Sequence, residues 1–394
     1  MISPAAELRS RMTAVQKAAL AIGLAGLAAS FVAAAREPSA FYPAYLFSYV
    51  FWIGLTLGSM AVLMVHYQVG GSWGVVTRRI LEAGMLTLPL MVVLFVPLLF
   101  GLRTLFPWAR PEAGADPGLR HLRPYENIPF FVARTGLYFA VWAVFAGFLV
   151  RGSVRLDREG SPAAATRLRR LSGPGLLLYA VTMFFASVDW VMSTEPRWSS
   201  TIYGMIYLAS QALSAFALAT AVLVVLASAP PLSAVVTAAR LNDLGNLLLT
   251  SVMLWAYVSF SQYLIIWAEN LPREIPWYLH RTSPGWKTIA LVLIVLHFGV
   301  PFVLLLFRGV KRNRAWIAGV AWGLLALRLL DDYWRIVPGF RPLGLELRWT
   351  DLAAVAGVGG LWVALFVEVL KRRSMLPLHD PEFEPVLAEA RAHA

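Results

Sequence analysis

The stretch LLLYAVTMFFASVD, residues 176–189, decides the fold. It is the middle of an apolar run of about 20 residues, which is long enough to cross a bilayer core of about 30 Å. Asp189 stands at its end, and ionisable side chains inside membrane segments are costly and usually functional. Comparable apolar runs recur along the chain, so we expect an all-α polytopic membrane protein whose few intramembrane charges mark its working site.

Composition supports this class. The 394 residues are 59% hydrophobic and 14% charged, with a mean hydropathy of +0.65, whereas soluble domains carry about 25% charged residues. The chain has no cysteine, which excludes disulfides, thiolate-held iron–sulfur clusters, c-type haem attachment and cysteine-ligated zinc. At most two of its six histidines fall in apolar segments. We therefore expect no bound haem, no metal site and no catalytic residue.

The net charge of +12 does not indicate a nucleic-acid partner, because the cations are spread over short loops between apolar runs. If the N-terminus is inside, 20 of the 34 lysines and arginines lie on the inner side and 13 on the outer side. The clearest inner loop, residues 151–170, holds six arginines. The positive-inside rule thus places both termini in the cytoplasm.

We expect about ten transmembrane helices. Their predicted ranges are 17–35, 44–67, 80–102, 129–150, 173–193, 202–228, 244–267, 287–307, 315–337 and 351–370. The first could instead be a signal peptide, because basic residues precede it and a run of small residues follows. Its apolar run is longer than the usual 7–15 residues of a signal peptide, so we expect a retained helix.

Short matches indicate an internal repeat. FPW at 106–108 resembles IPW at 275–277, FLVRG at 148–152 resembles LFRG at 306–309, and DW at 189–190 resembles DYW at 332–334. The repeat predicts two four-helix bundles, each with the same topology, plus two flanking helices. The expected divisions are an N-terminal segment with the first flanking helix (1–40), bundle one (41–200), bundle two (201–340), the last flanking helix (341–373) and an acidic cytoplasmic tail (374–394).

Five ionisable residues in the predicted spans are candidates for a proton path. Asp189 is either a proton acceptor facing a pocket or an interfacial surface residue. Arg328, Asp331 and Asp332 share one helix face by their spacing. They either form a self-compensated ion pair, or one acid neutralises the arginine and the other is free for chemistry or for a second pair. His297, halfway through its span, is either a packing residue or a proton relay.

The inner half of the path would begin in the second span. Ser48, Thr56, Ser59 and His66 fall on one helix face by their spacing. Such a polar stripe either bonds to neighbouring backbone or supports a water wire. Glu82, with Arg78 and Arg79, lies at the same inner level as His66, and we include Glu82 in the predicted path.

Several strings together resemble one known family. They are residues 47–66 with GGSWG at 70–74 and RRILE at 78–82, DWVMS at 189–193 through SSTIYG at 199–204, and LWAY at 254–257 through FSQYLIIW at 260–267 with NLP at 270–272. The chain resembles the F subunit of bacterial alternative complex III, a quinol:electron-acceptor oxidoreductase. That subunit belongs to the polysulfide-reductase-like membrane anchors, and the resemblance covers most of residues 40–380.

The resemblance implies a ten-helix subunit of the bacterial cytoplasmic membrane without a redox centre of its own. Its implied partners are c-haem subunits, an iron–sulfur subunit and a homologous C-type membrane subunit, and its implied non-covalent ligands are a quinone such as menaquinone and lipids. Asp189, Trp190 and Glu195 are the candidate quinol-binding residues. Two alternatives stay open, an independent secondary transporter and a purely structural scaffold.

Overall fold

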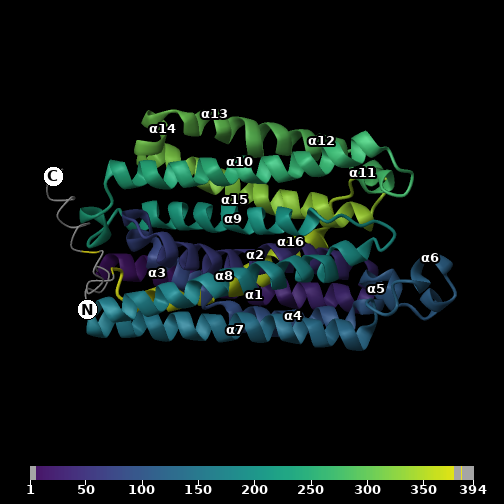
Figure 1. The fold of residues 1–394 in the computed structure, drawn as a ribbon, viewed down its shortest axis with the longest axis horizontal. Helices are drawn as coiled ribbons and strands as arrows, with labels where there is room; N and C mark the ends of the chain where they lie inside the picture. The colour runs from purple at the N-terminus through teal and green to yellow at the C-terminus, as the bar shows by residue number, and fades with distance from the viewer. Residues whose placement is uncertain (1–5, 377–382, 384–394) are drawn as a thin grey trace.

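The structure, a computed structural model, describes residues 6–376 and residue 383. Within these residues there are helices and no strands (Figure 1). Nine of the described helices or helix pairs are long and apolar enough to cross a membrane. The predicted class, an all-α polytopic membrane protein, is confirmed. Most of the predicted acidic tail, including Asp380, Glu382, Glu384 and Glu389, lies outside the described residues.

The first half of the described chain contains α1 (Ala6–Arg36), α2 (Pro38–Val69), α3 (Ser72–Met85), α4 (Leu88–Phe100), α5 (Leu102–Leu105), η1 (Pro107–Ala109), η2 (Pro111–Gly114), α6 (Pro117–Arg120), α7 (Ile128–Glu159), α8 (Pro162–Trp190) and η3 (Met192–Thr194). The second half contains α9 (Tyr203–Leu226), η4 (Leu232–Ala234), α10 (Ala238–Glu269), α11 (Ile275–Arg281), α12 (Trp286–Val292), the π-helical η5 (Leu293–Gly299), α13 (Val300–Leu306), α14 (Arg308–Arg312), α15 (Arg314–Ile336), η6 (Val337–Gly339) and α16 (Trp349–Arg372).

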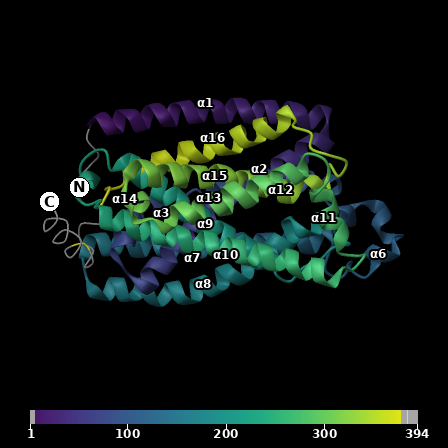
Figure 2. The ribbon, with the colours of Figure 1, turned by 90° about the horizontal axis from the view of Figure 1, so that it is seen from above.

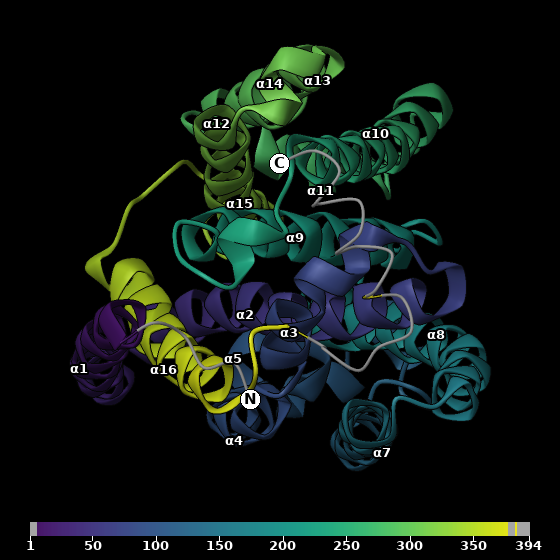
Figure 3. The same cartoon turned by 90° about the vertical axis from the view of Figure 1, so that its left-hand side faces the viewer.

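The long helices run side by side along one axis (Figure 1). We call the end that carries α5, α6 and α11 the outer end, and the end where α7 turns into α8 the inner end. Seen along this axis, α2 and α9 occupy the centre (Figure 3) and pack against each other. The helices α3, α4, α7 and α8 lie on the α2 side, whereas α10, α12, α13 and α15 lie on the α9 side.

The ninth predicted span is α15, which is too charged for the apolar criterion that the nine others meet. It has 23 residues and packs against α9 and α2. Asn313 begins it, because its side chain accepts hydrogen bonds from the backbone N–H groups of Ala315 and Trp316. The three charges at 328, 331 and 332 are buried, so this helix exposes none of them to lipid.

Several predicted boundaries were wrong at the inner end, where α1 begins at Ala6 rather than at 17 and α10 at Ala238 rather than at 244. The third span begins at Ser72 rather than at 80, and α7 and α8 continue through the predicted loop 151–170 to a turn at Gly160 and Ser161. Gly160 has a left-handed φ of 58°, which favours glycine after a helix end. The charged residues that had suggested a loop are tolerated within these helices, because they form ion pairs within the protein or lie on exposed helix faces.

The flanking helices α1 and α16 form a close antiparallel pair beside the central helices (Figure 2). Gly23 lies against Gly360, and Gly26 lies against Gly357. A Cβ atom added to Gly26 would meet the backbone nitrogen of Gly357 at 2.5 Å. Small residues at such crossings let helix backbones approach closely, which is how apolar helices gain packing energy in lipid.

This contact predicts opposite effects for two glycine-to-alanine substitutions. Gly26→Ala should destabilise the protein by about 1–3 kcal/mol, because the added methyl overpacks the α1–α16 contact. Gly323→Ala in α15 is the matched control, since its Cβ would meet nothing within 4 Å, and alanine is the better helix former by up to about 1 kcal/mol. Thermal unfolding in detergent, followed by tryptophan fluorescence, should show a lower Tm for Gly26→Ala only; equal Tm values would refute the close contact.

Candidate functional site

The inner cluster is built around Glu82 on α3. Because α3 begins at Ser72, Arg78 and Arg79 lie one turn before Glu82 on the same helix. Arg78 Nε lies 3.1 Å from Glu82 Oε1, and Arg79 Nη1 lies 2.8 Å from Glu82 Oε2. The Glu82 side chain is fully buried. A carboxylate in this position is tolerated because two guanidinium groups compensate its charge.

Two other segments complete the inner cluster. Ser153 of α7 donates a hydrogen bond to Glu82 Oε1, and Arg373, just after α16, reaches Glu82 Oε2 at 2.8 Å. Asp157 of α7 pairs with Arg79 at 2.6 Å. The cluster therefore joins α3, α7 and the end of α16 at the inner end, and Glu82 contacts three arginines.

His66 lies near this cluster at the inner end of α2. It is buried, and its ring lies edge-on to Trp73 at a centroid distance of 5.5 Å. It also lies beside the ring of Tyr67, which in turn faces the Arg78 guanidinium at 5.7 Å. The structure thus places His66 and Glu82 at one end, with Tyr67 and Arg78 between them.

The polar stripe of α2 is buried and bonded within the protein. Ser48 donates to the carbonyl of Ala354 on α16 at 3.0 Å, and Ser59 donates to the carbonyl of Leu55 at 2.7 Å. Thr56 shares a 2.7 Å hydrogen bond with Thr87. The Ser48 and Thr56 hydroxyls therefore join α2 to α16 and to the turn between α3 and α4. Of the two interpretations of the polar stripe, these contacts favour bonding to neighbouring groups of the protein.

The first outer cluster is centred on Asp189, one residue before the end of α8. Arg134 of α7 binds it through both carboxylate oxygens, with Nε and Nη2 each at 2.9 Å. The hydroxyl of Tyr138 donates to Asp189 Oδ2 at 2.7 Å. Asp189 is 1% exposed, so it is neither on the lipid surface nor a free acceptor: it is the acid of a buried, bidentate ion pair.

Trp190 packs in an aromatic group beside this pair. Its ring stacks on Phe139 and lies edge-on to Trp142, and its Nε1 donates to Thr135 Oγ1 at 3.1 Å. The indole fixes the last turn of α8 against α7. This contact orients Asp189 toward Arg134.

The second outer cluster lies on α15, and both of its acids are paired. Arg328 contacts both Asp331 and Asp332, and Arg335 adds a 2.8 Å ion pair to Asp331. The second pair comes from an arginine one turn further along the same helix face. Trp255 of α10 also donates to Asp331 at 3.1 Å. Arg328 and both acids are at most 3% exposed, so none of them faces lipid.

His297 lies in η5, where the helix widens into a π-helical turn. Pro301 explains the widening, because it has no N–H to bond the carbonyl of residue 297. His297 is fully buried, and its ring packs edge-on against Trp255 at a centroid distance of 4.1 Å. Neither ring nitrogen has a hydrogen-bond partner within the described part of the chain. π-turns occur frequently at functional sites, and this one places an imidazole beside the tryptophan that contacts Asp331.

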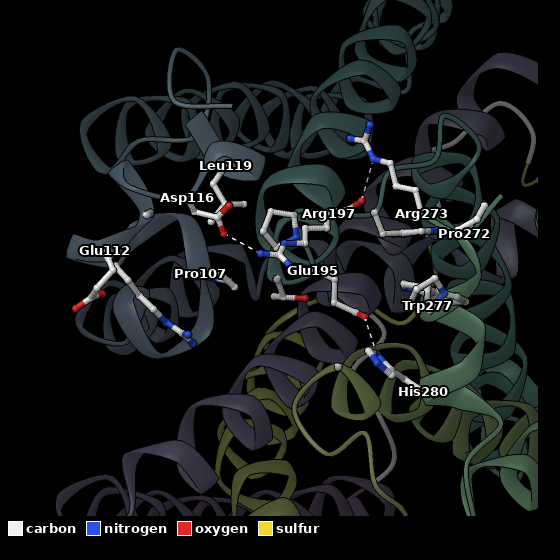
Figure 4. Close-up of a pocket in the computed structure, with 17 residues that line it drawn as sticks. Pro107, Glu112, Asp116, Leu119, Glu195, Arg197, Pro272, Arg273, Trp277 and His280 are labelled. Atoms are coloured by element: carbon white, nitrogen blue, oxygen red, sulfur yellow. Dashed lines mark hydrogen bonds and ion pairs between the residues drawn. The ribbon is translucent and has the colours of Figure 1, made fainter. Parts of the chain in front are cut away.

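A cavity of about 830 Å³ opens among the outer loops (Figure 4). Glu195 and His280 line it and contact each other at 3.3 Å. Trp198 and Trp277 also line it, and their rings stack at a centroid distance of 4.8 Å. Of the three candidate quinol-binding residues, only Glu195 lines this cavity, because Asp189 and Trp190 are buried between α7 and α8.

The Glu195 carboxylate is held ionised. Burial alone would raise the pKa of this group, but Arg281 at 2.7 Å and His280 outweigh burial and hold its pKa below the usual range. Arg281 is itself buried, with its guanidinium over the ring of Trp277 at 3.6 Å. The cavity therefore presents a fixed anion beside a partly exposed imidazole.

Sequence reasoning missed the arginines that complete these clusters. Arg134, Arg335 and Arg281 lie near helix ends and were counted as outer flanking charges. For Arg335 a signal existed, since 328, 331, 332 and 335 continue one helix face. For Arg134 and Arg281 there was none, because their partners Asp189 and Glu195 are distant in sequence. Arg341 and Asp351 form a further buried pair that was not predicted, at 2.7 Å.

Comparisons with known proteins identify no relative. No protein-family model matches the chain, and no curated protein matches it significantly. Among the described residues no group of histidine and acidic side chains has the arrangement of a metal site. Function is therefore inferred from the buried clusters and the sequence strings.

The Arg134–Asp189 pair predicts a large coupling energy. Arg134→Gln or Asp189→Asn alone should destabilise the protein by about 3–5 kcal/mol, because each leaves one buried charge unpaired. The double variant should lose less than the sum, with a coupling of about 1–3 kcal/mol. Equilibrium unfolding in mixed micelles measures the cycle.

The control cycle uses Arg155→Gln and Glu159→Gln, a surface pair whose side chains are 55% and 42% exposed. Its coupling should be about 0.3–0.5 kcal/mol. If the coupling of the buried pair were no larger than that of the surface pair, Asp189 and Arg134 would not form the bidentate pair described here.

Proposed function

We propose that this chain is a membrane subunit of a quinol:electron-acceptor oxidoreductase of the alternative complex III type. In this proposal it lies in a bacterial cytoplasmic membrane with both termini in the cytoplasm. It holds no redox centre and contributes a transmembrane path for protons. The family and partners are supported by the sequence strings at 47–82, 189–204 and 254–272; the path is supported by the buried charges.

The observation that carries the proton path is the presence of buried carboxylates near both ends of the helices. Glu82 lies near the inner end, whereas Asp189, Asp331 and Asp332 lie in the outer parts of α8 and α15. A charge at the bilayer centre costs about 2.5–3.5 kcal/mol on insertion scales, and such residues commonly mark ion pathways. Titratable groups at both depths are what a proton path across a membrane requires.

His297 supplies the group between these depths. A buried imidazole without a protein partner is rare, because buried polar groups are almost always hydrogen-bonded. Each ring nitrogen of a histidine can donate or accept a proton. In the proposed path internal water joins His297 to Asp331 and bridges the hydroxyl groups of α2.

The direction of insertion is supported by the arginines of α7 and α8. Arg151, Arg155 and Arg158 of α7, with Arg167, Arg169 and Arg170 of α8, surround the turn at the inner end. The positive-inside rule places such a cluster in the cytoplasm. The outer cavity with Glu195 would then open to the opposite side, where a quinol head group or a partner subunit could contact it.

Complete pairing of the acids favours one competing function, a purely structural scaffold. Glu82, Asp189, Asp331 and Asp332 each contact at least one arginine, as buried charges must in any role. A scaffold requires only that these acids be paired. A proton path also requires that groups along it take up and release protons. Proton movement therefore separates the two functions.

We expect Glu82→Gln, His66→Ala and Asp189→Asn to reduce proton movement by about tenfold or more. The first two remove proton-binding groups, and the third removes the buried negative charge of the outer cluster. The assembly containing the chain would be reconstituted in liposomes and assayed for quinol oxidation and for proton uptake with a pH dye. Glu159→Gln, at an exposed site, is the control. If the partner subunits and their haem are retained, the variant has assembled. If all three variants behave as wild type in both assays, the proton path is rejected and the chain is a structural scaffold.

Purification tests the proposed partners separately. Because the chain lacks cysteine, it cannot attach c-type haem itself. Affinity purification from native membranes should yield a multi-subunit assembly with a c-type haem spectrum, and the separated chain should be colourless. Recovery of the chain alone, or with stoichiometric haem of its own, contradicts the proposal.

A further inference from the structure

Glu126 lies at the outer end of α7, outside the membrane helices, beside the Asp189 cluster. Its backbone N–H donates to the carbonyl of Leu122 at 2.7 Å. The next residue, Asn127, caps α7 by accepting from the N–H of Phe130 at 3.0 Å. The backbone at Glu126 is therefore fixed by the start of α7. None of the sequence motifs had pointed to it.

Arg134 connects this loop to Asp189. Two of its nitrogens bind the Asp189 carboxylate, and the third, Nη1, donates to the carbonyl of Tyr125 at 2.9 Å. Its guanidinium also lies 3.8 Å from the ring centroid of Tyr125 and 4.3 Å from that of Phe130. These contacts use three of the five N–H groups of Arg134, and among the described residues Arg134 makes no hydrogen bond to Glu126.

Two carboxyl groups thus share one positive charge at the outer end. Asp189 accepts three hydrogen bonds, two from Arg134 and one from the hydroxyl of Tyr138. Glu126 has no such partner: its Oε2 is buried without a hydrogen bond within the described chain. Of the two acids, Glu126 is the one that can take up a proton without breaking an ion pair.

The charges that face Glu126 fix where it titrates. Burial and the negative charge of Asp189 raise the pKa of Glu126 to about 7, and the positive charge of Arg134 only partly opposes them. Tyr125 and Tyr138 complete this environment, and burial raises the pKa of Tyr125 to about 12, so that phenol stays neutral. Glu126 itself is only partly buried. Outer water can therefore reach a carboxyl that is half protonated near neutral pH.

We propose that Glu126 is the group that exchanges protons between the outer aqueous phase and the Asp189 cluster. This inference rests on the proposed proton path and names its outer terminus. In each transfer the Glu126 carboxylate accepts a proton from water of the path, and the resulting carboxylic acid releases it to outer water. Asp189 and Arg134 stay charged throughout, so the cluster alternates between neutral and singly negative, and no oxidant or reductant takes part.

The experiment compares Glu126→Gln with Glu269→Gln, an acid on the exposed outer end of α10. The purified full chain is titrated from about pH 5 to pH 9 while infrared spectroscopy follows the C=O band of protonated carboxyl groups. Wild type and Glu269→Gln should show a carboxyl that titrates near pH 7, and Glu126→Gln should lack it. Glu126→Asp should retain a titrating carboxyl, and Glu126→Ser serves as a second neutral variant if Gln disturbs the fold.

Proton movement in the reconstituted assembly gives the second readout. Glu126→Gln should lower it by about tenfold, and Glu126→Asp should restore most of it. If Glu82→Gln and Asp189→Asn stop proton movement while Glu126→Gln does not, the exchange role of Glu126 is overturned and the proton path stands. If none of the three changes proton movement, the path and the exchange role both fail. A wild-type infrared titration in Glu126→Gln overturns the proposal by itself.

Discussion

A charge buried between membrane helices must meet an opposite charge, and the polar interior of this protein is organised by that constraint. In hydrocarbon no water solvates an unpaired carboxylate or guanidinium. Glu82, Asp189 and the two acids of α15 each bind arginine. These pairs in turn fix neighbours: the Asp189 pair joins α7 to α8, and Arg373 joins the end of α16 to α3. Charge pairing thus decides which helix faces turn inward.

The sequence predicted the fold class because apolar length is a local property. Every predicted span corresponds to one helix or to consecutive helical segments. This includes α15, which is too charged to meet the apolar criterion for a membrane span. The inner boundaries failed for a physical reason: Arg78, Arg79 and Glu82 compensate one another within α3, so the helix continues where isolated charges would have ended it. Local pairs on one helix, such as Arg328 with Asp331, could be predicted from spacing.

The long-range half of the site could not be predicted. Arg134 binds an acid 55 residues away, and Arg281 binds one 86 residues away. Such a pair depends on how two helices are rotated against each other, which hydrophobic periodicity fixes poorly when most of a helix surface is apolar. Glu126 was missed for the same reason, because its significance comes from Asp189 on another helix and not from its own neighbours in sequence.

The two outer clusters differ in a way that assigns them different parts of the proposed path. Around Asp331, two arginines and Trp255 bind the acids, and the unbonded group beside them, His297, is fully buried. Around Asp189, the unbonded group is Glu126, which outer water reaches. An enclosed imidazole can relay protons only to other groups inside the protein, whereas a partly exposed carboxyl can exchange them with solvent. The α15 cluster therefore fits an internal relay, and the α7–α8 cluster fits the outer end of the proposed proton path.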